Sequence, residues 1–185
     1  MLNLSFAGQT VLVTGGSRGI GAAIVRGVAT CGGRVIATGT SDTPPEWIAP
    51  LLDQHPDQTI IYETLDFRTA DWLDRLDGIV AQYPDISVVV NNAGIAHVAD
   101  IREQQIEDVR QVLEVNLVAT AMVTSRVARN MTARKEPYGR IVNISSIMGF
   151  VARAGRGSYA AAKTGMIGQT RACALDLAEA GILVN

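Results

Sequence analysis

Short apolar runs alternate along the chain with longer segments in which apolar residues recur at helical spacing. The short runs predict strands, and because the run from Ile86 to Val90 is nearly apolar throughout, it suits a sheet covered on both faces. The predicted strands are 10–14, 34–38, 59–64, 86–90, 140–145 and 182–185. The predicted helices are 19–30, 46–54, 70–82, 106–131 and 158–179.

This alternation predicts an α/β fold, a doubly wound parallel sheet of the Rossmann type with ligands at the carboxyl ends of its strands. With 185 residues, 48% of them hydrophobic, the chain is long enough for one domain with a sizeable core. The helix predicted at 46–54 is the least regular, because Pro44, Pro45 and Pro50 crowd it.

A glycine-rich turn, Thr14–Gly21, joins the first predicted strand to the first predicted helix. Its spaced glycines let the backbone turn tightly and let a pyrophosphate approach the helix N-terminus, where free N–H groups favour an anion. The spacing is G-x-x-x-G-x-G, which differs from the G-x-G-x-x-G fingerprint, but it stands at the head of a βα unit. It predicts a dinucleotide site with the residues Gly15, Ser17, Arg18, Gly19, Ile20 and Gly21.

Tyr159 and Lys163 stand four residues apart in a predicted helix and therefore share one face. A nearby ammonium favours phenolate over phenol, so this phenol could exchange a proton with an alcohol or a carbonyl oxygen. The pair alone also fits an amphipathic helix with a half-buried Tyr and a surface Lys. The glycine turn upstream makes proton-transfer chemistry the stronger interpretation.

With these motifs the chain resembles the short-chain dehydrogenase/reductase family, in particular its 3-oxoacyl-acyl-carrier-protein reductase-like members, from about residue 8 to the last residue. Further positions match: the turn Asn91–Gly94 follows a strand, and Asn116 lies in the longest predicted helix. Ser146 stands thirteen positions before Tyr159, the family's usual interval. Asp66, at the end of a strand, matches a family residue that contacts adenine.

The resemblance implies an oxidoreductase that transfers a hydride between a nicotinamide cofactor and a secondary alcohol or ketone. In this scheme Tyr159 exchanges the proton and Ser146 stabilises charge on the substrate oxygen. Lys163 assists Tyr159 and binds the nicotinamide ribose, while Asn116 holds a water that links Lys163 to solvent. The implied catalytic residues are Asn116, Ser146, Tyr159 and Lys163. The implied cofactor-binding residues beyond the glycine turn are Thr40, Asp66, Asn92, Tyr159 and Lys163.

The cofactor preference depends on the end of the second strand. NAD-selective sites usually carry an acidic residue there, whereas Gly39 occupies that position here. Arg18 resembles NADP-preferring members, and Thr40 or Ser41 could donate hydrogen bonds to a 2′-phosphate. NADP(H) is therefore favoured over NAD(H). The alternative is that Arg18 is only solvated and that Asp42 binds the ribose.

Two classes of function stay open at this point. The first is an NADP(H)-dependent enzyme acting on a small molecule such as a 3-oxoacyl thioester, a polyol or a sugar, in either direction. The second is a catalytically silent nucleotide-binding regulatory or scaffold protein on the same fold. The complete set of Asn116, Ser146, Tyr159 and Lys163 favours the enzyme, because binding alone does not need Tyr159.

Composition narrows the classes of binding partner and the location that we expect for this protein. A net charge of −2 with mixed signs gives no basic surface for nucleic acid, and the two cysteines have no metal-ligand spacing. With no signal peptide and no apolar run of membrane-spanning length, a cytoplasmic protein is expected. The resemblance implies a homotetramer. It also implies that residues 1–185 form a single dinucleotide-binding and catalytic domain that is incomplete at its C-terminus.

Overall fold

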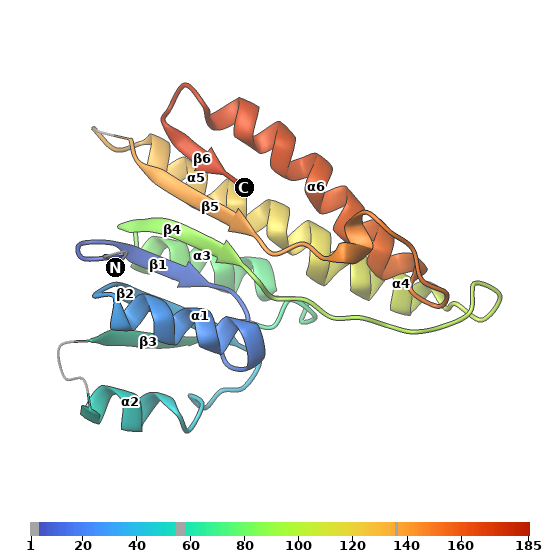
Figure 1. Ribbon diagram of the computed structural model, residues 1–185, viewed down its shortest axis with the longest axis horizontal. Coiled ribbons are helices and arrows are strands. Elements are labelled where there is room, and N and C mark those ends of the chain that lie inside the picture. The colour runs from blue at the N-terminus through green and yellow to red at the C-terminus, as the bar shows by residue number, and fades with distance from the viewer. Residues whose placement is uncertain (1–3, 55–57, 136) are drawn as a thin grey trace.

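The computed structural model describes residues 4–54, 58–135 and 137–185. Within these ranges six strands form one parallel sheet in the order β3-β2-β1-β4-β5-β6 (Figure 1). They are β1 (Thr10–Val13), β2 (Arg34–Gly39), β3 (Thr59–Thr64), β4 (Ile86–Asn91), β5 (Gly139–Asn143) and β6 (Ile182–Val184). The predicted doubly wound parallel sheet is confirmed.

Helices cover the sheet from two sides (Figure 1). One side carries α1 (Gly19–Thr30) and α2 (Ile48–Gln54). The other carries α3 (Trp72–Gln82), α5 (Ala119–Thr132) and α6 (Gly157–Leu177). The remaining helical segments are α4 (Ile106–Leu113), a π-helical turn η1 (Glu114–Val118) and a 3₁₀ turn η2 (Ile147–Gly149).

The alternation of side chains along each strand builds two separate cores. In β1, Val11 and Val13 face α1, whereas Leu12 faces α3 and α5, and all three are fully buried. Because successive strand side chains point to opposite faces, a run that is apolar throughout fills both layers at once. The sheet is thereby fixed between its helices, and its carboxyl edge is held in place.

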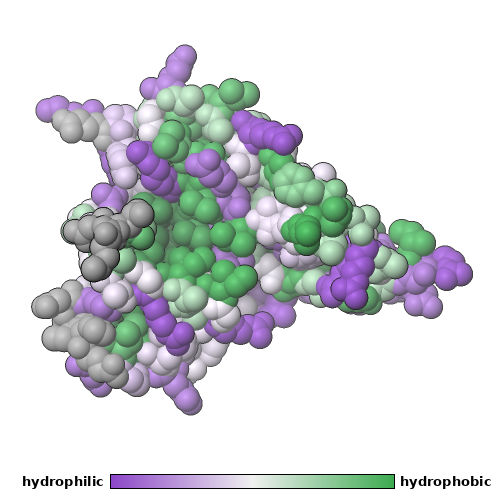
Figure 2. All heavy atoms as spheres, viewed as in Figure 1, coloured by the Kyte–Doolittle hydropathy of each residue, from purple (hydrophilic) through white to green (hydrophobic). Residues whose placement is uncertain are grey.

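The side of the sheet that carries α1 is covered unevenly. Helices α1 and α2 pack over β1, β2 and β3. On β5 and β6, by contrast, Val142 is 37% exposed and Leu183 is 52% exposed, and each points away from the neighbours that fill the other core. Figure 2 shows hydrophobic side chains gathered over the sheet on this face of the molecule.

The helix predicted at 106–131 is interrupted in the structure, which was not predicted. Its middle, η1, is a π-helical turn that contains Asn116. The Asn116 side-chain amide donates to the Val112 carbonyl at 2.8 Å, the acceptor that the backbone N–H of residue 116 would use in a regular α-helix. This competition explains the wider turn, and such turns are frequent at functional sites.

Two predicted helix starts were also too early. The helix predicted from residue 46 begins at Ile48, whose N–H bonds the Pro45 carbonyl in a preceding turn, so Trp47 lies outside the helix. The helix predicted from residue 70 begins at Trp72, with Asp71 as its N-cap residue.

Candidate active site

A cleft of about 320 Å³ opens at the carboxyl edge of the sheet, where β1 and β4 are neighbours. The strand order reverses at this point, because the chain continues from β1 to β2 on one side and from β4 to β5 on the other. Among the predicted cofactor residues, those that line the cleft are Gly15, Ser17, Arg18, Ile20, Gly21, Thr40, Asp66 and Asn92. The other predicted cofactor residues, Gly19, Tyr159 and Lys163, lie in the described part of the chain but do not line this cleft.

The glycine turn is fixed by Thr14 and Asn92. Thr14 Oγ1 accepts hydrogen bonds from the backbone N–H groups of Asn92 and Ala93, at 3.0 and 3.1 Å. Asn92 Nδ2 donates to the carbonyls of Thr14 and Gly15, both at 3.0 Å. A Cβ on Gly21 would stand 2.6 Å from Asn92 Nδ2, so only glycine lets helix α1 start this close to the turn.

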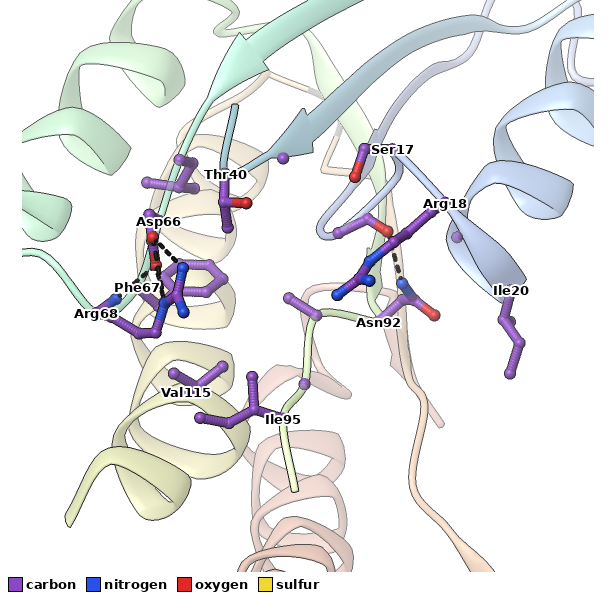
Figure 3. Close-up of a pocket in the computed structure, with 16 residues that line it drawn as sticks. Ser17, Arg18, Ile20, Thr40, Asp66, Phe67, Arg68, Asn92, Ile95 and Val115 are labelled. Carbon is purple, nitrogen blue, oxygen red and sulfur yellow. Dashed lines mark hydrogen bonds and ion pairs between the residues drawn. The ribbon is translucent and has the colours of Figure 1, made fainter. Parts of the chain in front are cut away.

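The N-terminus of α1 points its unpaired backbone N–H groups at the cleft. Arg18 is the N-cap residue and makes no side-chain cap, and the first turn carries no acidic residue. Gly19, with a φ of 54°, lets the chain turn into the helix here. Free N–H groups and the helix dipole together favour an anion at this position. Figure 3 shows Arg18 and Asn92 on one side of the cleft and Asp66 on the other.

Asp66 has a partner that the sequence did not predict. The Arg68 guanidinium binds its carboxylate, with Nη2 2.6 Å from Oδ2, and the Arg68 backbone N–H donates to Oδ1 at 3.0 Å. Hydrogen bonds from the Arg68 side chain hold the pKa of the Asp66 carboxyl below its ordinary value. The i, i+2 spacing of an acid and a base was the only signal in the sequence. The pair fixes the carboxylate at this end of the cleft.

The end of β2 is crowded at Gly39, where an added Cβ would first meet the Tyr62 hydroxyl. A Cβ on Gly39 would stand 2.9 Å from Ser17 Cβ and 3.0 Å from Ser17 Oγ. Thr40 is exposed and lines the cleft, whereas the Ser41 carbonyl accepts hydrogen bonds from residues of β3. Asp42 lines a different hollow, beside Tyr62.

Tyr159 and Lys163 lie one turn apart on α6, as predicted. Lys163 Nζ is 5.8 Å from the centroid of the Tyr159 ring and donates to the Ile144 carbonyl at 2.8 Å. Only 3% of Lys163 is exposed. This burial lowers the pKa of its ammonium from 10.5 to about 8, because the low-dielectric surroundings disfavour the charge.

Ser146 and Ser145 have different partners. Ser146 is the N-cap of η2, and its Oγ accepts from the Met148 N–H at 3.1 Å, which leaves its hydroxyl proton free to be donated. Ser145 Oγ instead donates to the Lys163 carbonyl at 3.2 Å. The hydroxyl of Ser145 therefore holds the loop against α6.

Asn116 connects the cleft to Lys163 by way of Gly94. Its Nδ2 donates to the carbonyls of Ile95 and Val112, both at 2.8 Å. Within the described ranges its buried Oδ1 has no hydrogen-bond partner. A Cβ on Gly94, which lines the cleft, would stand 2.6 Å from that Oδ1 and 3.8 Å from Lys163 Nζ. The free oxygen and the ammonium therefore lie close to the same small residue.

Two negative findings apply to the described ranges. They contain no group of three or more His, Cys, Asp or Glu side chains that could hold a metal ion. No helix among the described residues is both long and apolar enough to cross a membrane.

The chain is similar in sequence to known proteins over nearly its whole length. The family model for short chain dehydrogenases matches residues 9–185. The 3-oxoacyl-[acyl-carrier-protein] reductase FabG of Escherichia coli (strain K12) is 34% identical over 182 residues, which cover 98% of this chain and 72% of that protein. Its counterpart in Aquifex aeolicus (strain VF5) is 34% identical over 185 residues, which cover 100% of this chain and 74% of that protein.

A solved structure is similar over nearly the whole chain. It is a Beutenbergia cavernae protein assigned as an NAD(P)-dependent gluconate 5-dehydrogenase, with NADP bound at low occupancy. It superposes with a TM-score of 0.86 at 33% identity, covering 98% of this chain and 71% of that one.

The buried ammonium of Lys163 predicts a pH dependence of stability. Folded Lys163 releases its proton near pH 8 and unfolded Lys163 near pH 10.5, so the unfolded chain binds more protons between these values. We expect the unfolding free energy, relative to Lys163→Met, to rise by roughly 3 kcal/mol as pH increases through this window and to be flat below it. Urea unfolding of both proteins from about pH 7 to about pH 10 measures the difference. If the unfolding free energies of the two proteins change in parallel with pH, the burial of a charged Lys163 is contradicted.

Proposed function

The chain belongs to the short chain dehydrogenase family, and on this premise we propose that it transfers a hydride between NADP(H) and a secondary alcohol or ketone. One observation carries the proposal. The cleft that starts at the anion-binding end of α1 reaches Gly94, beside which the buried Lys163 ammonium lies next to Tyr159. This proximity supports one site for phosphate binding and proton transfer.

The residues of the cleft fit a dinucleotide with a 2′-phosphate. The N-terminus of α1 accommodates the pyrophosphate, and Arg18 with Thr40 binds the 2′-phosphate at the end of β2. Asp66, held by Arg68, contacts the adenine. Gly39 supports NADP(H) over NAD(H), since it supplies no carboxylate to bind a ribose 2′-hydroxyl or to repel a 2′-phosphate. When bound, the nicotinamide supplies or accepts the hydride.

Each proposed catalytic side chain has a separate role in the proton transfer. Tyr159 gives its phenolic proton to the carbonyl oxygen during reduction and removes it from the alcohol during oxidation. The Lys163 ammonium stabilises the phenolate and binds ribose hydroxyls. Ser146 donates its free proton to the same substrate oxygen and stabilises the charge that develops there. The unpaired Oδ1 of Asn116 accepts from a water that connects Lys163 to solvent.

The relatives support a carbonyl substrate but differ in its type. One is named as a reductase of 3-oxoacyl groups on a carrier protein, and the other is assigned as a gluconate 5-dehydrogenase. Both names describe a secondary alcohol and ketone pair. A panel of 3-oxoacyl thioesters, polyols and sugar acids, assayed by absorbance of the reduced nicotinamide, tests the proposal and identifies the class. Absence of turnover with every member of the panel, despite cofactor binding, would favour a nucleotide-binding protein without catalysis.

Tyr159→Phe tests the proton donor. The variant keeps the ring and loses the hydroxyl, so we expect kcat to fall about 100- to 10,000-fold while NADPH still binds. The matched control is Tyr138→Phe, which makes the same change at a 40% exposed residue next to β5. Steady-state kinetics on the best substrate of the panel gives the answer. A Tyr159→Phe rate equal to that of the control would refute the assignment.

Arg18→Ala tests the cofactor preference. A charge-assisted hydrogen bond to phosphate contributes about 1.5–3 kcal/mol, so NADPH affinity should fall roughly 10- to 150-fold with little change for NADH. Arg75→Ala, at a 48% exposed residue paired with Asp71, is the control for lost positive charge. Fluorescence titration of both cofactors checks this. Equal affinities of the unmutated protein for NADPH and NADH would show that the preference does not exist.

We also propose that the working protein is a homotetramer. A hollow of about 300 Å³ lies between helices α5 and α6, and small residues line part of it: the partly exposed Ala121, Ser125 and Cys173 and the buried Ala128. This surface lets a helix of another copy approach closely. Light scattering should give a mass of four chains, and Ser125→Arg should shift it to smaller species. A mass of one chain at micromolar concentration would rule out self-association.

A further inference from the structure

We propose that Trp47 is a positioning residue for the phosphate-binding turn, acting through the Ser17 carbonyl. Its indole Nε1 donates to Ser17 O at 2.9 Å, across thirty positions of sequence. Ser17 lines the cleft directly before Arg18. The inference deepens the proposed function, on which it rests, because it concerns how the same cofactor site is held.

Trp47 is itself held in place. The Arg26 guanidinium lies over the indole ring, with its Cζ 4.3 Å from the ring centroid. The ring also packs, partly buried, against the core beneath α1 and α2. Because Trp47 precedes α2 rather than lying in it, its side chain can reach the turn after β1. The donor is therefore fixed from the exposed face of α1 on one side and from the core on the other.

The bond to Trp47 decides the direction of one peptide group. In a trans peptide the C=O and N–H groups point in opposite directions, so anchoring Ser17 O on the indole turns the Arg18 N–H the other way. Asn92 Nδ2 holds the carbonyls of Thr14 and Gly15 in the same manner. The N–H groups of those two peptides, on Gly15 and Gly16, donate to Thr38. The Trp47 bond therefore bears on the Arg18 N–H, the one that remains to meet an anion with the first N–H groups of α1.

Ser17 is fixed at a second point. Its Cβ and Oγ lie 2.9 and 3.0 Å from where a Cβ on Gly39 would be, so its side chain rests directly on the end of β2. A rotation of the Ser17–Arg18 peptide would bring the carbonyl oxygen towards the bound phosphate and move the Arg18 side chain. Trp47 prevents this rotation while contacting neither the phosphate nor the reacting atoms.

The test compares three variants of the full chain. Trp47→Phe removes the N–H donor and keeps an aromatic ring for Arg26. Trp72→Phe makes the same change at the other tryptophan, whose Nε1 donates to Glu114 at 3.1 Å. Arg26→Met removes the guanidinium and keeps the indole donor. For each variant, calorimetric titration gives the Kd for NADP⁺, thermal unfolding gives Tm, and kinetics gives KM for NADPH and kcat.

We expect Trp47→Phe to weaken NADP⁺ binding about three- to tenfold, the value of one hydrogen bond, and to raise KM for NADPH with kcat unchanged. Trp72→Phe should lower Tm comparably but leave the Kd within about twofold. Arg26→Met, which removes one of the two supports of the indole but keeps its N–H, should weaken binding less than Trp47→Phe does. If Trp47→Phe behaves as Trp72→Phe does, or if Arg26→Met weakens binding as much, the N–H is not what positions the turn. If the unmutated protein binds neither NADP⁺ nor NAD⁺, the proposed function itself fails.

A second measurement does not depend on the folding of Trp47→Phe. In Trp72→Phe the remaining indole emission comes from Trp47 alone, since the chain has two tryptophans. Titration with NADP⁺ should change this emission with the same midpoint as calorimetry. Emission that is unaffected at saturating NADP⁺ would overturn the inference, because ligand on this turn must alter the hydrogen-bonded indole.

Discussion

The arrangement of the site depends on the contact between the turns after β1 and β4. The Asn92 side-chain amide donates to two carbonyls of the glycine turn, those of Thr14 and Gly15. Thr14 Oγ1 in turn accepts from the backbone N–H groups of Asn92 and Ala93. These turns adjoin only because β1 and β4 are neighbours at the point where strand order reverses. The first turn holds the anion-binding helix end and the second leads through Gly94 towards Lys163. One set of hydrogen bonds therefore sets the distance between the N-terminus of α1 and Lys163.

A second polar connection extends this rigidity to α6. Asn91 Nδ2 donates to Thr124 of α5 and to Asn143 of β5, and Asn143 Nδ2 donates to Thr170 of α6. Such amides are expensive to bury unless they are bonded, and within the described residues the Oδ1 of Asn91 is buried without a hydrogen-bond partner. Here they fix the register between β4, β5 and the helix that carries Tyr159 and Lys163. The polar positions of an otherwise apolar strand are thus the ones that fix α6, which carries the proposed catalytic residues, against the sheet.

Lys163 shows the conflict between stability and function in this site. Its ammonium is buried and has one carbonyl partner at 2.8 Å, so charge at this position opposes folding at neutral pH. The same ammonium is what a phenolate and ribose hydroxyls would pair with. The π-helical turn at Asn116 is a comparable departure from regular geometry, because the side chain takes a backbone acceptor and leaves its own oxygen free. Both irregularities lie beside Gly94.

Much of this protein could be predicted from local pattern. Strand and helix positions follow from the period of apolar residues, the glycine turn from a strand followed by a helix, and the Tyr159–Lys163 pair from a spacing of four, because each depends on neighbours in sequence. The bond from Trp47 to Ser17, the crowding of Gly39 and the position of Gly94 between Asn116 and Lys163 join residues far apart in the chain. The Asp66–Arg68 pair is local, but its place in the cleft is not. The sequence by itself determined which elements form and which side chains could react. Only the tertiary structure decided which of them meet, because strand order, and not chain order, sets which loops share an edge of the sheet.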